Sequence, residues 1–304
     1  MGWRRLRARI RPAAEAPPQR PIKERSGGTE FFFREAGTGP LIVVVHISKT
    51  AGTALRRFVR ANLADAEVEV IHKLRYVART PGERLDWFRE WYWTLEPGRR
   101  ERLSCVMSHW AGYLLPAVDR DVDALTLVRE PVDRALSYYF HKQRQHPEWS
   151  LASLEDLAAE RSLSEWRRHS RGEVLDRLFN NWQSRVLLAV FHDVSTLEPA
   201  SASSDEAELW RQRLRELVDG VFLVGVQDRF EQYVGLLARR YSWQEVHVPR
   251  AKVNPQRPSS PAVSPGLREE ILSYNWLDRE LHEWSRQAQI ERESGVAGEA
   301  GLRG

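Results

Sequence analysis

The stretch LIVVVHISKTAGTALRRF, residues 41–58, constrains the fold of this chain more than any other part of its sequence. Five consecutive branched aliphatic residues, 41–45, are typical of a strand buried on both faces, as the strands of parallel sheets are. Small and polar residues follow, and from Thr53 the apolar residues recur at helical spacing. A strand that leads through a tight turn into a helix is the repeating unit of parallel α/β folds.

Three further short apolar runs fit strands of the same sheet: 103–107, 124–128 and 221–226. Helical patterns follow the last two runs, to about Gln145 and to Tyr241 respectively. Strands separated by helices predict an α/β domain with a mostly parallel central sheet flanked by helices. Because ligands bind beyond the carboxyl ends of such strands, we expect three turns to share one edge of the sheet: 46–52, 108–113 and 129–131.

The sequence predicts one main domain between two tails. Residues 29–290 form the predicted domain, within which 150–218 reads as helices only and is predicted to be an insertion or a lid. Residues 1–28 contain four prolines and end in two glycines, which indicates a disordered basic tail. Residues 291–304 are rich in Gly, Ala and Glu and are predicted to be frayed.

Positive charge is concentrated in the first tail. The chain has a net charge of +4, and residues 1–28 hold eight basic and two acidic side chains, a net of +6, so the remainder carries −2. A main domain without basic excess does not fit a general nucleic-acid binder. For the tail, contact with an anionic membrane surface or RNA and a solvated extension are both open, and we favour the solvated extension.

The apolar runs are short, since the longest, 41–45, is far below the length that crosses a bilayer. No signal-peptide pattern follows the basic N-terminus, so we expect a cytoplasmic protein without an integral membrane segment. Cys105 is the only cysteine, which excludes a disulfide within the chain, and its apolar neighbours indicate a buried thiol. No cluster of His, Asp and Glu has metal-ligand spacing.

The turn after the first strand carries the groups that bind a phosphate. Small residues at 51–53 let backbone N–H groups approach an anion, and the helix that begins near Thr53 adds the positive end of its dipole. Lys49 supplies a charge, and Thr50 and Thr53 supply hydroxyl groups. The turn lacks the glycines of a Walker A loop. Taken alone, it is equally compatible with a plain strand-to-helix turn and a solvated lysine.

A second segment, LTLVREPVDRALSYY at 125–139, has a related pattern. Arg129 follows a strand, and Ser137 lies on the helix that begins near Pro131. A guanidinium group and a hydroxyl beside the edge of a sheet suit a second phosphate. The alternative is a surface arginine followed by a serine on a helix face.

Together the two segments resemble the nucleotide site of sulfotransferases that use 3′-phosphoadenylyl sulfate (PAPS). Lys49 to Thr53 resembles the loop for the 5′-phosphosulfate, with Lys49, Thr50, Ala51, Gly52 and Thr53 at its positions, and Arg129 to Ser137 resembles the 3′-phosphate motif. The spelling HISKTAGT is most similar to the carbohydrate branch that includes heparan sulfate 2-O-sulfotransferase. Weaker similarities lie in SHWAGYLL, NNWQSRVLL, VGVQDRFEQYVGLLARR and NWLDRELHEW, so the resemblance covers roughly residues 40–286.

The resemblance implies a P-loop sulfotransferase fold and an in-line transfer that needs no metal. It implies that Lys49 acts at the bridging oxygen of the donor and that His109, in SHWAG, is the base that takes the acceptor proton. Related branches use a glutamate on the helix after the loop, but 53–63 holds no carboxylate. We expect His46 to orient the loop. Two other histidines are weaker candidates for the base: His141 and His146.

This sequence departs from the family pattern at three positions. Ser48 replaces a common proline, Ala54 stands where a serine is frequent, and Ser108 replaces the glycine before the catalytic histidine. Each change removes or adds a group close to the expected site.

The leading hypothesis is therefore a PAPS-dependent sulfotransferase that acts on a hydroxyl group, expected to belong to a glycan or glycolipid. A P-loop kinase or NTPase would need Mg²⁺ and a Walker-B-like Asp at the end of a strand, whereas the strand 124–128 is followed by Arg129 and Glu130. A non-catalytic nucleotide- or glycan-binding relative is the third hypothesis.

Overall fold

The computed structural model of the chain describes residues 39–71, 80–144, 154, 176–190, 205–244 and 263–301. These residues form a five-stranded sheet in the order β2-β3-β1-β4-β5, in which all neighbouring strands are parallel. The strands are β1 Leu41–Val45, β2 Val68–Val70, β3 Cys105–Ser108, β4 Val122–Val128 and β5 Phe222–Val226. The predicted α/β class with a parallel central sheet is confirmed.

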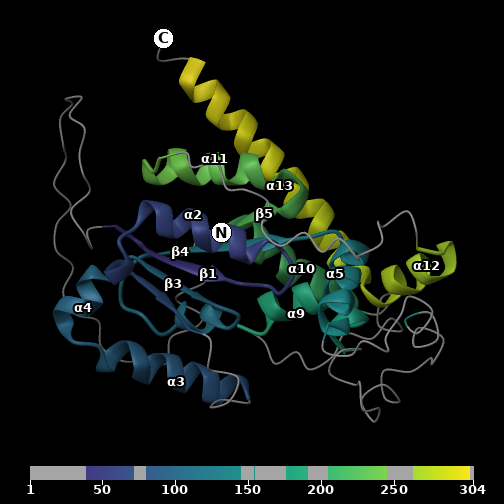
Figure 1. Ribbon diagram of the computed structural model, residues 1–304, viewed down its shortest axis with the longest axis horizontal. Coiled ribbons are helices and arrows are strands. Elements are labelled where there is room, and N and C mark those ends of the chain that lie inside the picture. Colours follow the sequence, from purple (N-terminus) through teal and green to yellow (C-terminus); the bar gives the residue numbers. More distant parts are fainter. Residues whose placement is uncertain are drawn as a thin grey trace.

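Helices cover both faces of this sheet (Figure 1). One face packs against α2 Gly52–Asn62 and α11 Phe230–Tyr241. The other face packs against α3 Pro81–Thr94, α9 Trp182–Leu188, α10 Asp205–Gly220 and α13 Trp276–Gly301. Helices α5 Pro131–Gln143 and α12 Pro265–Tyr274 form a smaller core together, and α4 Pro97–Arg102 precedes β3. Short 3₁₀ turns cover Asp65–Glu67, Ala111–Leu114 and Gln227–Arg229.

The central strand β1 shows why these residues form a covered sheet. Leu41, Val43 and Val45 pack into the core on the α3 and α13 side, whereas Ile42 and Val44 pack against α2 and α11. All five side chains are buried, and full burial of such a side chain stabilises the fold by about 1.5–3 kcal/mol. An uninterrupted aliphatic run is therefore what this position requires.

Cys105 lies at the start of β3, fully buried in the core on the α2 and α11 side. Burial raises the pKa of its thiol above the ordinary value. The predicted buried thiol is thus observed, and the group has no access to solvent.

Several boundaries differ from the sequence prediction. The short strand β2 was not predicted, because three residues with Glu69 at the centre give no recognisable apolar run. Helix α13 continues to Gly301, whereas the sequence predicted fraying from 291; Ala and Glu favour helix, which outweighs the glycines here. Of the predicted helical region 150–218, α9 and α10 pack into the main core, and most of the rest lies outside the described residues, as does the tail 1–28.

The sheet brings the three predicted turns together at one edge. Strands β3, β1 and β4 are adjacent and parallel, so their carboxyl ends point the same way. His46 follows β1, His109 follows β3 and Arg129 follows β4. The common edge expected from the sequence is therefore confirmed.

Candidate active site

The turn after β1 has an unusual backbone. Lys49 and Ala51 adopt left-handed conformations, with φ of 72° and 67°, which cost about 1–2 kcal/mol each for residues with a side chain. The Thr50 hydroxyl, 1% exposed, donates to the Ile47 carbonyl at 2.9 Å and so holds the turn together from inside. This hydroxyl was predicted to face the ligand, but the structure directs it into the turn. A left-handed turn that is braced in this way presents its backbone N–H groups to an anion.

Helix α2 starts directly from this turn. Its N-terminus has no side-chain cap, and its first turn holds no acidic residue. The first N–H groups of a helix have no acceptor within the helix, and together with the dipole they favour an anionic ligand. Gly52 and Thr53 are the first two residues of the helix, as the predicted phosphate turn requires.

Arg129 joins the second predicted segment to the first. Its Nη1 donates to the carbonyl oxygen of Lys49 at 3.3 Å, and its Nη2 lies 3.5 Å from a carboxylate oxygen of Asp133. The arginine side chain is 14% exposed, so its orientation is fixed by these contacts. Ser137 lies close to two turns into α5 and is half-buried. The structure thus brings Lys49 and Arg129 together, with Ser137 farther along the helix.

His109 is held by the residue that precedes the turn. Its Nδ1 is hydrogen-bonded to the backbone carbonyl of His46. Because a carbonyl only accepts, Nδ1 must carry the proton, and Nε2 is then the basic nitrogen of the ring. The side chain is exposed at the carboxyl end of β3, where a substrate can reach it.

The His46 ring connects the base to the turn. It stacks on the His109 ring with centroids 4.5 Å apart and planes 18° from parallel. On its other side it fills the space above Gly52, because a Cβ at this glycine would lie 2.0 Å from the His46 Cδ2. The orienting role predicted for His46 agrees with this packing, and Gly52 is required for a close approach as well as for the turn.

Two of the family departures have local structural consequences. Ser108 is buried, and its hydroxyl accepts a hydrogen bond from the Trp110 N–H at 3.2 Å, so the serine stabilises the turn that presents His109. Ala54 packs its methyl group into the core under α2, so no hydroxyl lies at that position. Of the weaker candidates for the base, His141 is exposed near the end of α5, and His146 lies outside the described residues.

The sequence did not predict which residues bind the backbone of Arg129. The Arg129 N–H donates to Gln183 Oε1 and the Gln183 Nε2 donates to the Arg129 carbonyl, both at 2.9 Å. Asp278 of α13 in turn bonds the backbone of α9. Gln183 and Asp278 lie in the segments NNWQSRVLL and NWLDRELHEW, which are similar to the family. That similarity did not assign a role to either residue.

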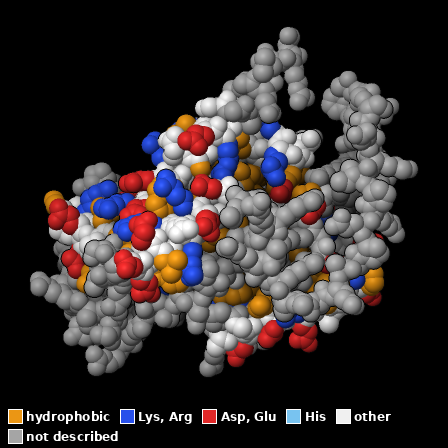
Figure 2. Space-filling view, turned by 180° about the vertical axis from the view of Figure 1, so that it is seen from behind, with side chains coloured by type: hydrophobic (Ala, Val, Ile, Leu, Met, Phe, Trp, Pro, Cys, Tyr) orange, Lys and Arg blue, Asp and Glu red, His pale blue; other side chains and the backbone are white. Residues whose placement is uncertain are grey.

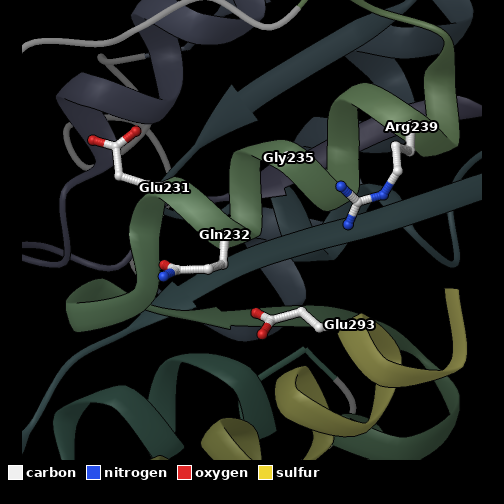
Figure 3. A pocket seen from close by; sticks show the side chains of 5 residues that line it. All are labelled: Glu231, Gln232, Gly235, Arg239 and Glu293. Atoms are coloured by element: carbon white, nitrogen blue, oxygen red, sulfur yellow. The ribbon is translucent and has the colours of Figure 1, made fainter. Parts of the chain in front are cut away.

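Two surface hollows lie outside the set of predicted site residues. One of about 520 Å³ lies at the ends of β4 and β5 and is lined by Glu130, Asp228, His282, Glu283, Arg286, Gln287 and Ile290. Another of about 410 Å³ lies between α11 and α13 and is lined by the side chains that Figure 3 shows, including Glu231, Arg239 and Glu293. Both mix acidic and basic groups, and neither is lined by a predicted site residue.

The described surface offers no other strong indication of a ligand. On the face shown in Figure 2, acidic and basic side chains are interspersed. Among the described residues, no group of three His, Cys, Asp or Glu could hold a metal ion. None of the described helices combines the length and apolar character needed to cross a membrane.

Comparison with known proteins points in one direction. The chain is 27% identical over 281 residues to heparan-sulfate 6-O-sulfotransferase 2 of Homo sapiens, 26% over 281 to that of Mus musculus and 25% over 280 to that of Gallus gallus. Each alignment covers 83% of this chain but only 45%, 44% and 67% of these relatives, so the chain spans less than half of the two mammalian proteins. No family model matches.

Among solved structures, a sulfotransferase from Alicyclobacillus acidocaldarius aligns with a TM-score of 0.40 and 16% identity, over 81% of this chain and 95% of that chain. The resemblance to carbohydrate sulfotransferases is confirmed by the sequence relatives. They are named for 6-O-sulfation, whereas the resemblance in the turn had suggested the branch with the 2-O enzyme.

Proposed function

We propose that this chain is a sulfotransferase that moves a sulfuryl group from PAPS to a hydroxyl group of a carbohydrate or glycoconjugate. The observation that carries the proposal is the contact of Arg129 with the left-handed turn at Lys49, which combines two anion-binding segments in one site. The relatives, all named heparan-sulfate sulfotransferases, support a sulfated glycan product.

The residues present fit a donor with two anionic ends. The uncapped start of α2 and the turn at 49–53 suit the 5′-phosphosulfate, and Arg129 with Ser137 suits the 3′-phosphate. Lys49 offsets the negative charge that builds up on the bridging oxygen as the bond from sulfur to the phosphate oxygen breaks.

His109 has the role of general base in this proposal. As the acceptor oxygen forms its bond to sulfur, Nε2 of His109 takes the hydroxyl proton, and 3′,5′-adenosine bisphosphate leaves. The bond from Nδ1 to the His46 carbonyl keeps the ring in the tautomer that this step needs.

Calorimetric titration with 3′,5′-adenosine bisphosphate and with ATP plus Mg²⁺ tests the donor. We expect metal-independent binding of the bisphosphate that Arg129→Ala weakens by about 100-fold, as loss of a charged hydrogen-bonding partner does. A preference for Mg²⁺-ATP would instead identify an enzyme that uses a nucleoside triphosphate.

Transfer from labelled PAPS to a pool of glycan acceptors tests the reaction. His109→Ala should lower the rate by about 10²–10⁴-fold, the usual contribution of a general base, while bisphosphate still binds. His141→Ala, at an exposed histidine on α5, is the matched control and should leave the rate unchanged. Binding without transfer in the wild-type protein would favour a non-catalytic relative.

A further inference from the structure

Both backbone polar groups of Arg129, its N–H and its carbonyl, are hydrogen-bonded to one side chain, that of Gln183. Its Oε1 accepts from the Arg129 N–H and its Nε2 donates to the Arg129 carbonyl, both at 2.9 Å. Gln183 is fully buried. Because the N–H needs an acceptor and the carbonyl needs a donor, only one orientation of the amide satisfies both. The backbone of Arg129 is therefore fixed in position and direction beyond the last residue of β4.

Gln183 is itself held by a reciprocal contact between two helix starts. Asp278, in the first turn of α13, accepts from the N–H groups of Gln183 at 3.1 Å and Ser184 at 2.7 Å. Asn181, at the start of α9, accepts from the N–H groups of Leu277 at 2.8 Å and Asp278 at 3.1 Å. Each helix thus supplies the cap of the other, and all the capping side chains are fully buried. Gln183 cannot move along the sheet edge without breaking these bonds.

We propose that Gln183, fixed by Asp278, is a positioning residue for the second phosphate site: it sets the backbone of Arg129 so that the guanidinium group selects a nucleotide with a 3′-phosphate. The inference rests on the proposed function. A rigid backbone limits the conformers of the long arginine side chain before the ligand binds. Less conformational entropy is then lost on binding, which increases the affinity. The contacts of Arg129 with Lys49 and Asp133 then orient its far end.

The chain offers a matched control in Gln289. This glutamine is also fully buried, and it is hydrogen-bonded to the backbone at the carboxyl end of the next strand, β5. Its Oε1 accepts from the Val226 N–H at 2.8 Å and its Nε2 donates to the Arg229 carbonyl at 3.1 Å. Replacement of either glutamine by methionine removes two backbone hydrogen bonds. Gln289 Nε2 also donates to a carboxylate oxygen of Glu293 at 2.8 Å, so Gln289→Met should cost at least as much stability as Gln183→Met. Of the two glutamines, Gln183 is the one that is hydrogen-bonded to Arg129.

The test compares two ligands that differ in one group, 3′,5′-adenosine bisphosphate and 5′-AMP. For Gln183→Met we expect the dissociation constant for the bisphosphate to rise about tenfold, while that for 5′-AMP stays within about twofold of the wild type. Gln289→Met should lower the melting temperature at least as much as Gln183→Met and still leave both constants within about twofold of the wild type. In an Arg129→Ala background, Gln183→Met should have no further effect on the bisphosphate.

Three results would overturn the inference. Gln183→Met could bind the bisphosphate as tightly as the wild type, or lose both ligands equally, as a generally damaged protein would. The two changes at Arg129 and Gln183 could also prove additive. Where Gln183→Met does not fold, Gln183→Glu is measured in the same way, since it keeps the size and the bond from the Arg129 N–H but repels the carbonyl. A wild-type protein that shows no preference for the bisphosphate would overturn the proposed function instead, and the inference with it.

Discussion

Individual side chains at the carboxyl edge of the sheet act in pairs. His46 orients His109 through both its backbone carbonyl and its ring, and Lys49 is linked to Arg129 through its carbonyl. The sequence could identify the chemical groups, because lysine, arginine and histidine after strands are readable as a pattern. It could not reveal the pairing, since that depends on which strands are neighbours and on backbone carbonyl groups that every residue has.

Gly52→Ala is predicted to damage both stability and catalysis. The new methyl group would lie 2.0 Å from the His46 ring, so the ring must leave its place beneath His109. We expect the free energy of unfolding to fall by about 1–3 kcal/mol, the usual cost of overpacking, and the transfer rate to fall as well. Denaturant unfolding and the transfer assay measure the two effects.

Gly82→Ala provides the control for that substitution. Gly82 also lies in the first turn of a helix, α3, but a Cβ there would meet no atom within 4 Å. The free energy of unfolding of the Gly82→Ala variant should differ from that of the wild type by less than about 0.5 kcal/mol, or be slightly higher. If the Gly52→Ala and Gly82→Ala variants were equally stable and equally active, the packing of His46 on Gly52 would contribute to neither stability nor activity.

Among the elements, α9 and α13 matter most for the site although they contribute no predicted catalytic residue. Their starts cap each other, and α9 holds the end of β4. The sequence predicted helices throughout 150–218, the region that contains α9, as an insertion or a lid. It could not show that the helix is packed against the sheet, since a buried amide reads in sequence as an ordinary polar residue.

Asp278→Asn tests this junction of helices. Asp278 accepts three hydrogen bonds from Gln183 and Ser184, and it is the acidic group that most favours the charged form of buried Arg134, whose pKa is lowered by burial to about 10. The amide of asparagine would direct hydrogens at these donors and remove the charge. We expect a loss of about 3 kcal/mol in the free energy of unfolding.

Denaturant unfolding of a second Asp→Asn variant gives the comparison. Asp86 on α3 is largely exposed and pairs only with Arg89, at 3.4 Å, among the contacts described. Asp86→Asn should shift the unfolding free energy by less than about 0.5 kcal/mol. A loss at Asp278 no larger than this would mean that the reciprocal caps contribute little.

At the scale of the whole molecule, the sequence predicted the parallel sheet and the edge that the three turns share, because four of the five strands lie in recognisable apolar runs. The sequence did not predict the order of the strands, because the pairing and register of strands depend on how the sheet packs against the helices and not on the local pattern of residues. The basic tail and the cytoplasmic location stay predictions. The sequence did not predict the identity of the acceptor, because the family motifs do not include the contacts that would bind it.

Alkaline pH is predicted to unfold the protein, for reasons spread over the entire fold. Burial raises the pKa of Tyr92, Tyr233 and Tyr241 above the ordinary value of 10.0. Above that pH the unfolded chain releases these protons and the folded protein keeps them, so stability is complete below about pH 10 and declines above it. Arg134 and Arg292 act in the opposite sense, because burial lowers the pKa of each and the folded protein releases those protons first.

The three phenols outnumber the two guanidinium groups, and the buried Cys105 thiol, whose pKa is also raised by burial, acts in the same sense as the phenols, so the free energy of unfolding should on balance have a negative slope with pH. Unfolding free energies measured at several pH values above 9 or so should show this slope. Tyr233→Phe should reduce it, since that hydroxyl, which donates to the Leu223 carbonyl at 2.7 Å, would no longer titrate in the unfolded chain. A flat profile through about pH 11 would contradict the prediction.

Cys105 gives the protein a reporter of its own motions. The thiol is the only one in the chain, lies at the start of β3, and has a raised pKa because it is buried. An alkylating reagent can react with it only after the core between the sheet and helices α2 and α11 has opened. The labelling rate in native buffer therefore measures how often this side of the fold opens. Any ligand that closes the site should slow that labelling without touching the cysteine.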